Sequence, residues 1–378
     1  MIQPSGAAFR YVDSAGVLDR LAVKIDRVRR VALDTEADSL HHYYEKTCLI
    51  QLTLSGDNFI VDPLADLDPA HFLEALSQSR LILHSAEFDL RLLRNSYGFR
   101  PANEVFDTML AAQLLGYRKI SLADMVEAFF DVAMVKKGQK SDWSRRPLTE
   151  AQLAYAINDT RYLEPLAERQ KAELKRLGRE DWHRESCERM IESTAVDNER
   201  DPDDVWRIKG HSVLKPRQLA FLRELWRWRE QEAQKVDRPP FMIIGNQQLV
   251  HLATWAAARK DKMALVFPKL PRHFTGDRLR KLKQTIRRVQ SLDPKKWPKP
   301  RTSRMPVPAG PLFEKLRSEC ARVAEELDID PTLIANRRTL ETISRELPRG
   351  IEELISVGKM MRWQAELLAP GFETIVNQ

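Results

Sequence analysis

Four carboxylates and one phenol in the first half of the sequence could hold divalent cations and address one reacting centre: Asp34, Glu36, Asp89, Asp159 and Tyr155. Asp34 and Glu36 follow a short apolar run and are two residues apart, so on a strand both would point to the same face. Like charges about 4 Å apart repel by roughly 4 kcal/mol at an effective dielectric of about 20. A divalent cation is the simplest compensation. The alternative is that one acid caps a loop and the other is solvated.

The other three residues have similar double interpretations. Asp89 follows the apolar stretch 81–84 and would open a helix, where an acid can simply favour the helix N-terminus. Tyr155 and Asp159 are four residues apart in a helical pattern, so they share one face. Alternatively, Tyr155 is ordinary helix packing and Asp159 pairs with a nearby arginine. The ordered combination, with spacings of about 50 and 70 residues, favours one acidic site.

The pattern around these residues predicts an α/β domain that ends near residue 195. Short β-rich or apolar runs predict strands, and apolar residues at helical spacing predict helices. Thr149 stands three residues before Gln152, a capping-box signal for a long helix. The predicted strands lie at 31–33, 47–54, 58–61 and 81–84, and the predicted helices at 69–77, from 88 to about 98, from 108, from 121 to 130 and from 149.

Three motifs in this order resemble the DEDD exonucleases, in the subclass with a tyrosine in the third motif. They read Leu33-Asp34-Thr35-Glu36, His84-Ser85-Ala86-Glu87-Phe88-Asp89-Leu90 and Tyr155-Ala156-Ile157-Asn158-Asp159. Within that superfamily the chain is similar to the ribonuclease D family over roughly residues 10–195. The supporting pieces are Thr47-Cys48-Leu49-Ile50-Gln51-Leu52, Phe106-Asp107-Thr108 and Asp142-Trp143-Ser144-Arg145-Arg146-Pro147-Leu148.

The resemblance implies an RNase H-like domain with a mixed sheet and 3′→5′ exoribonuclease activity with two Mg²⁺ or Mn²⁺ ions. Carboxylates without a His or Cys ligand set suit such hard cations and disfavour zinc. Asp34 is expected to bridge both ions, Glu36 and Asp159 to favour the ion that activates water, and Asp89 to act on the other. Tyr155, with an unperturbed pKa of about 10, would aim the attacking water rather than serve as a base.

The resemblance also suggests residues that contact substrate: Thr35, His84, Phe88, Trp143, Arg145 and Arg146. Trp143 could stack on a base while the arginines hold a phosphate, or it could be a packed tryptophan in a surface loop. His84 could equally be a satisfied core residue, and Asp107 reads best as a helix N-cap. Ala37 stands where an apolar residue such as phenylalanine is expected, and 38–46 is longer and more polar than expected. That stretch is expected to line the terminal-nucleotide pocket.

The C-terminal half predicts two all-α modules separated by polar, proline-containing linkers at 197–204 and 293–300. Trp206-Arg207-Ile208-Lys209-Gly210, the helix from Lys215 and Pro239-Pro240-Phe241-Met242-Ile243-Ile244 resemble the HRDC module. Residues 310–376 look like a second, diverged copy. We expect an exonuclease domain over 1–195, an HRDC domain over 203–292 and an HRDC-like domain over 308–378.

Charge is unevenly distributed along the chain. Residues 1–200 hold 27 Lys and Arg against 32 Asp and Glu, whereas 201–378 hold 34 against 22. Residues 278–304 contain eleven basic residues and one acid, which would attract a phosphate backbone or form a solvated face. Three tryptophans at helical spacing, Trp206, Trp226 and Trp228, favour core packing over base stacking.

The remaining composition narrows the setting. No apolar run approaches the roughly 18 residues of a membrane helix, and residues 1–13 lack the basic and then apolar pattern expected of a secretory signal. The three cysteines are far apart, which favours free thiols in a reducing cytoplasm. The family resemblance implies action on RNA with a free 3′ end, such as tRNA precursors, and release of nucleoside 5′-monophosphates. We also expect a cytoplasmic monomer. The alternatives are a DNA 3′→5′ exonuclease and a non-catalytic nucleic-acid-binding protein.

Overall fold

The computed structural model describes residues 8–28, 30–134, 138–195, 201, 204–259, 267–300 and 310–376. Its contacts divide the chain into two units, one made of 1–37, 46–196 and 307–378 and the other of 38–45 and 197–306. Within the described ranges, no helix is both long and apolar enough to cross a membrane.

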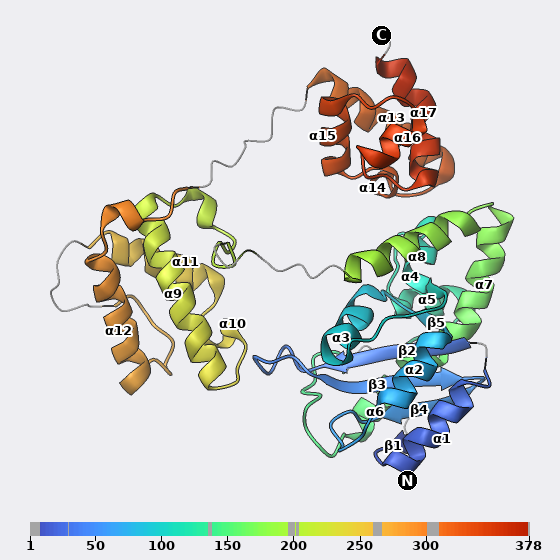
Figure 1. Ribbon diagram of the computed structural model, residues 1–378, viewed down its shortest axis with the longest axis horizontal. Helices are drawn as coiled ribbons and strands as arrows, with labels where there is room; N and C mark the ends of the chain where they lie inside the picture. Colours follow the sequence, from blue (N-terminus) through green and yellow to red (C-terminus); the bar gives the residue numbers. More distant parts are fainter. Residues whose placement is uncertain are drawn as a thin grey trace. The chain divides into compact units, whose positions relative to one another are not determined.

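The first unit is built on a six-stranded mixed sheet with the order β1-β4-β3-β2-β5-β6 (Figure 1). β3 runs antiparallel to both of its neighbours, β2 and β4. β1 is parallel to β4. On the other side of the sheet, β2, β5 and β6 are parallel to one another. This confirms the expected mixed sheet. The strands are β1 (Phe9–Val12), β2 (Arg30–Ala37), β3 (Thr47–Leu54), β4 (Asp57–Val61), β5 (Arg80–Leu83) and β6 (Val105–Asp107).

Both faces of the sheet are apolar, so each must be covered by helices. On one face, Val31, Leu33 and their neighbours pack against the buried residues of the helices α1 (Ala15–Ile25), α2 (Ala70–Gln78) and α3 (Glu87–Tyr97). On the other face, Ala32 and Leu49 belong to clusters that contain residues of the later helices. These are α4 (Thr108–Leu114), α5 (Leu122–Phe130), α6 (Glu150–Arg161), α7 (Leu163–Arg176) and α8 (Glu180–Ala195).

The sequence-based predictions placed most of these elements correctly but missed β1, α1 and β6. The structure confirms the Thr149 capping box at the start of α6, and the Ser121 hydroxyl caps α5 by accepting from the Asp124 N–H. β2 is longer than the predicted run 31–33 and includes Asp34 and Glu36 near its end, where the sequence placed both acids on one face of a buried strand. The long helix predicted from Thr149 ends at Arg161, and α7 begins after Tyr162.

The second unit contains the first helical module. Its helices are α9 (Pro216–Lys235), α10 (Pro240–Ile243), α11 (Asn246–Ala257) and α12 (Gly276–Gln290), with short 3₁₀ turns at His211–Val213 and Pro294–Lys296. Trp206 and Trp228 are buried and Trp226 is partly buried against the same core, as predicted. Most of the first predicted linker, 197–200 and 202–203, lies outside the described residues, whereas the second, 293–300, is described and includes the turn Pro294–Lys296.

The β2–β3 connection, residues 38–45, belongs to this second unit. The backbone N–H of Tyr43 donates to Asp237 Oδ1 at 3.0 Å, and His42 Nδ1 lies 2.7 Å from Asp237 Oδ2. The Tyr43 hydroxyl donates to Glu230 Oε2 at 3.2 Å. The polar stretch that the sequence singled out therefore packs on α9 and the residues after it. Its expected part in a nucleotide pocket stays a prediction.

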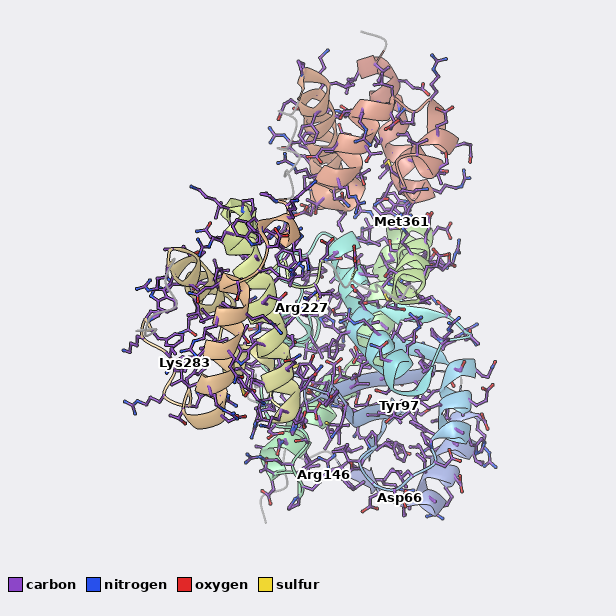
Figure 2. All side chains as sticks on the ribbon, turned by 60° about the vertical axis from the view of Figure 1, so that its left-hand side comes forward. Asp66, Tyr97, Arg146, Arg227, Lys283 and Met361 are labelled. Atoms are coloured by element: carbon purple, nitrogen blue, oxygen red, sulfur yellow. The ribbon has the colours of Figure 1, made fainter. Side chains whose placement is uncertain are left out.

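The second helical module comprises α13 (Pro311–Leu327), α14 (Pro331–Ile334), α15 (Arg337–Glu346), α16 (Gly350–Ser356) and α17 (Arg362–Val376). It packs against α8 within the first unit. Trp363 stacks on Trp182 with ring centroids 4.9 Å apart, and the Arg362 N–H donates to Glu185 at 2.6 Å. Met361, labelled in Figure 2, accepts from the Ser186 hydroxyl at 3.7 Å.

Candidate active site

Strand β2 places two carboxylates on one face of the sheet. Residues two apart share a face, so Asp34 and Glu36 point to the same side as Ala32, the side that α6 and α7 cover. Tyr155 and Asp159 lie one helical turn apart on α6, which contacts β2, β3 and β4. Ligand oxygens of Asp34, Glu36 and Asp159 lie within 4.8 Å of one another. The structure thus brings together three of the four predicted acids.

Asp89 is held slightly apart because it arrives from the other face of the sheet. β5 pairs with β2 only as far as Ala32, and α3 follows β5, so the N-terminus of α3 fills the space beside the end of β2. There Asp89 Oδ1 accepts from the Thr35 backbone N–H at 2.9 Å and from the Thr35 hydroxyl at 2.5 Å. Asp89 therefore takes the backbone donor that β5 no longer pairs.

Burial and mutual repulsion disfavour the ionised form of all four acids. Burial raises the pKa of Asp34 well above its ordinary range, and the negative charges of Asp89, Asp159 and Glu36 add to that effect. Burial together with Asp159 and Asp89 raises the pKa of Glu36 to about 9. Burial raises the pKa of Asp89 to about 7, despite its hydrogen bonds from Thr35, and that of Asp159 to about 7.

Tyr155 is a hydrogen-bond donor in this site. Burial first, and then the charges of Asp159, Glu36 and Asp34, raise the pKa of the phenol. The hydroxyl hydrogen-bonds to the Asp159 carboxylate. A protonated phenol can orient a water molecule but cannot remove its proton, which agrees with the role expected from the sequence.

The donor set fits divalent metal ions. Four carboxylates at one end of β2 offer only oxygen ligands, which Mg²⁺ and Mn²⁺ prefer. Among the described residues, no salt bridge pairs any of them with Lys or Arg. Carboxylates with raised pKa values and no basic partner are expected where cations from solution complete the charge balance.

Three of the predicted substrate-contacting residues flank the acids. Thr35 is buried at 5% exposure because its hydroxyl and N–H are engaged by Asp89. His84 is half-buried, with Nδ1 2.8 Å from the Thr108 hydroxyl. Phe88 is 38% exposed, so among these three it alone offers an open apolar surface to a ligand. Their contact with substrate stays a prediction, which the exposure of Phe88 favours most.

The predicted substrate-contacting residues after α5 are differently placed. Trp143 is 1% exposed and packs against Tyr155, so in this structure it is a core residue rather than a base-stacking surface. Arg146 donates to both oxygens of Asp62 at 2.6 Å and to the Cys48 carbonyl at 2.8 Å. Arg145 is exposed and pairs with Asp142 at 3.0 Å. The burial of Trp143 and the pairing of the half-buried Arg146 with Asp62 therefore argue against substrate contacts by these two residues, whereas Arg145 remains accessible.

Asp107 has a larger role than the N-cap that the sequence predicted. It caps α4 by accepting from the Met109 and Leu110 N–H groups, as expected. It also accepts from the N–H groups of Ser85 at 3.1 Å and Ala86 at 2.8 Å, in the turn that leads into the helix of Asp89. The position of Asp107 at the end of β6, beside β5, was the signal, but the sequence did not reveal β6.

The basic stretch from 278 is largely a helix face whose cations have acidic partners. Arg278 donates to Glu232 at 3.1 Å, and Lys281 lies 3.6 Å from the same carboxylate. Arg288 pairs with Glu224 at 2.7 Å, and both glutamates are buried. Lys283, labelled in Figure 2, projects from the same helix, α12. The predicted attraction for phosphate therefore rests on part of the stretch only, and residues 301–304 lie outside the described chain.

Known proteins share both the fold and the domain order. Residues 9–175 match the family model of a 3′-5′ exonuclease, and residues 218–266 and 310–376 match the HRDC domain. The chain is 31% identical over 331 residues to ribonuclease D of Pseudomonas paraeruginosa, which covers 86% of each chain. The structure of Escherichia coli RNase D, an exoribonuclease involved in structured RNA processing, superposes with a TM-score of 0.71 at 25% identity, covering 98% of this chain and 99% of that one.

A protein from Bifidobacterium adolescentis has the same fold, with a TM-score of 0.83 at 22% identity over 100% of this chain and 99% of that one. The fold and the site together define a 3′→5′ exonuclease that carries HRDC domains. Within that class, the chain belongs to the ribonuclease D family. Membership of this family makes it a hydrolytic 3′→5′ exoribonuclease that uses divalent metal ions.

Proposed function

We propose that the chain removes nucleotides from the 3′ end of RNA as nucleoside 5′-monophosphates at a site formed by Asp34, Glu36, Asp89, Asp159 and Tyr155. The observation that carries this proposal is the convergence of three carboxylates from β2 and α6, with oxygens within 4.8 Å, inside a domain of the matching family. Two Mg²⁺ or Mn²⁺ ions bound there would supply an activated water and neutralise charge on the reacting phosphate.

Each residue of the site has a role that follows from its placement. Asp34 lies close to the other acids: its ligand oxygen is within 4.8 Å of those of Glu36 and Asp159, and its chain neighbour Thr35 donates to Asp89. This position would suit a ligand shared by both ions. Glu36 and Asp159 would bind the ion on the side of Tyr155, whose hydroxyl is hydrogen-bonded to the Asp159 carboxylate. Asp89 would serve the other ion, while the Thr35 N–H and hydroxyl both donate to its Oδ1 and fix the orientation of the carboxylate. Tyr155 would orient the attacking water.

The substrate is proposed to be RNA with a free 3′ end, including tRNA precursors. Support comes from the ribonuclease D relatives and from the E. coli enzyme of structured RNA processing. The phenyl ring of Phe88, 38% exposed beside Asp89, is suited to contact the terminal base. Because one chain supplies every residue of the site, we propose that a monomer suffices. The three free, buried cysteines support a reducing compartment, the cytoplasm.

The test is to incubate the full-length protein with a tRNA precursor that carries a 3′ trailer and a 5′ label, in Mn²⁺ or Mg²⁺ and in chelator. Stepwise shortening from the 3′ end that stops in chelator, with 5′-monophosphates as products, is expected. Internal cuts, or hydrolysis unaffected by chelator, would overturn the proposal. A DNA oligomer of matched sequence in the same assay is expected to be degraded more slowly, and equal or faster loss of DNA would reassign the substrate.

A further inference from the structure

The backbone of Gly138 lies directly against the ring of Tyr155. A Cβ atom at Gly138 would stand 2.6 Å from Tyr155 Cγ, 2.8 Å from Cδ2 and 2.9 Å from Cβ, distances that real side chains do not adopt. Gly138 also has a φ of +146°, a conformation that residues with a Cβ rarely adopt. The approach of this backbone to the ring therefore requires glycine for two independent reasons.

The segment that follows Gly138 is anchored to the body of the domain. The Ser141 N–H donates to the Gly138 carbonyl at 2.8 Å, which closes a turn. Two residues later Trp143 is 1% exposed in a cluster with Leu49 and Ile60 of the sheet. Arg146 Nη1 then donates to the Trp143 carbonyl at 2.7 Å. Because the backbone after Gly138 is fixed, it cannot move to relieve the contact between an added Cβ and the Tyr155 ring. The side chain of Tyr155 must therefore shift.

Tyr155 cannot shift without losing its present contacts. Its ring centroid is 6.0 Å from that of the buried Trp143, with an interplanar angle of 41°. Its hydroxyl is hydrogen-bonded to the carboxylate of Asp159, which lies one turn along the same helix. Because the hydroxyl is at the far end of the ring, rotation about the side-chain bonds near Cγ displaces it further than it displaces the atoms in contact with Gly138.

We propose that Gly138 is a positioning residue for Tyr155: its backbone, together with Trp143, holds the ring where the tyrosine hydroxyl reaches the carboxylate site. This inference rests on the proposed function, in which that hydroxyl orients the attacking water. The segment 138–143 thereby gains a role in the chemical step although it contributes no ligand or proton.

The test compares Gly138→Ala with Gly178→Ala in the full-length protein on single-stranded RNA. Gly178 also has a positive φ, +67°, but a Cβ there would meet nothing within 4 Å, so it reports backbone strain alone. Gly138→Ala is expected to lower kcat by roughly 10- to 100-fold, because small misplacements of catalytic groups cost that much. KM and the Mn²⁺ concentration for half-maximal activity should be unchanged. Gly178→Ala should retain the parent kcat.

A double-mutant cycle separates positioning from general damage to the fold. In a Tyr155→Phe background there is no hydroxyl to misplace, so Gly138→Ala should lower kcat by less than about 2-fold. An equal loss in both backgrounds, or an unchanged kcat in Gly138→Ala, would overturn the proposal. If Gly138→Ala is too unstable to assay, its thermal midpoint in the Tyr155→Ala background decides. Removal of the ring should restore the midpoint lost to alanine, and failure to restore it would also refute the positioning role.

The parent protein and Tyr155→Phe distinguish the two levels of inference. A parent that does not shorten RNA, or a Tyr155→Phe variant as fast as the parent, counts against the proposed function itself. An active parent, a slow Tyr155→Phe and an unimpaired Gly138→Ala count against the role of Gly138 alone.

Discussion

The exonuclease domain contains two buried acidic sites, Asp62 and the four acids at the end of β2. Burial disfavours the charge of a carboxylate at both sites, but the surroundings of the two sites differ. Asp62 is 5% exposed, and it accepts two hydrogen bonds from Arg146 and one from the Tyr11 hydroxyl, each at 2.6 Å. Burial alone would raise the pKa of Asp62, but the hydrogen bonds from Arg146 and Tyr11 and the charge of Arg146 outweigh it and lower that pKa. The Asp62 network is closed and complete.

The acidic site at the end of β2 is the reverse case. Burial raises the pKa of each of its four acids, and the charged neighbours that act on Glu36 and Asp159 are other carboxylates. A protein that can supply an arginine to one buried acid could supply one to another. Among the residues that the structure describes, the β2 site has no basic partner, as expected for acids that bind cations from solution, whereas Asp62 serves the fold.

The largest expected effect is on activity at the acidic site at the end of β2, which we call the open site because no basic residue pairs with its acids among the described residues. Asp34→Asn should lower kcat by about 10³-fold, equivalent to about 4 kcal/mol of transition-state stabilisation, because it removes the ligand nearest the other three acids. The same change removes a carboxyl group whose ionised form is disfavoured by burial and by the neighbouring acids, so the metal-free protein should unfold at an equal or higher temperature. Asp57→Asn, on an exposed carboxylate at the start of β4, is the matched control and should keep the parent rate. Loss of both activity and metal-free stability in Asp34→Asn would contradict the comparison.

The second effect is on stability at the closed network. Arg146→Ala should lower the free energy of unfolding by about 3 kcal/mol, because it leaves the buried Asp62 carboxylate unpaired. Arg145→Ala, on a side chain that is 79% exposed, should cost less than about 1 kcal/mol. Urea denaturation of both variants measures the difference. Adding Asp62→Asn to Arg146→Ala should recover part of the loss, and a double variant less stable than Arg146→Ala would show that the ion pair is not the cause.

The part of this comparison that could be read from the sequence is the part set by local periodicity. Spacing of two on a strand and four on a helix correctly placed Asp34 with Glu36 and Tyr155 with Asp159 on common faces. That the strand and the helix then meet was inferred from the resemblance to a known family, not from periodicity. Asp89 accepts a hydrogen bond from the Thr35 N–H because β5 stops pairing with β2 at Ala32. No local sequence pattern encodes where that strand pairing ends.

The closed network was missed because its members are far apart and each looks ordinary alone. Asp62 and Arg146 are separated by 84 residues, and Tyr11 lies on β1, a four-residue strand that the sequence pattern did not reveal. Trp143 was ambiguous for the same reason. A tryptophan among polar residues can face solvent or core, and only its tertiary neighbours, Leu49 and Ile60, decide for the core.

The pH dependence of stability should differ between metal-free and metal-bound protein. Since the pKa values of Glu36, Asp89 and Asp159 are raised to about 9, 7 and 7, the folded protein keeps protons that the unfolded chain has lost. Stability in chelator should therefore be highest near pH 5 and fall towards pH 9, by about 1.4 kcal/mol per pH unit for each retained proton. Mn²⁺ should flatten or reverse this slope, because ions replace the protons. Thermal midpoints across this range, in chelator and in Mn²⁺, test it. Identical slopes would mean that the acids do not bind the ion.

The smallest expected effect probes the closed network through its phenol. Tyr11→Phe removes one hydrogen bond to Asp62 but leaves both bonds from Arg146, so it should cost about 1 kcal/mol of stability. Because Arg146 already neutralises Asp62, the same loss is expected in chelator and in Mn²⁺, and the rate of RNA hydrolysis should not change. Urea midpoints in the two media measure this. A loss that depends on the ion would place Asp62 within reach of the metal site and remove the distinction between the open and the closed carboxylates.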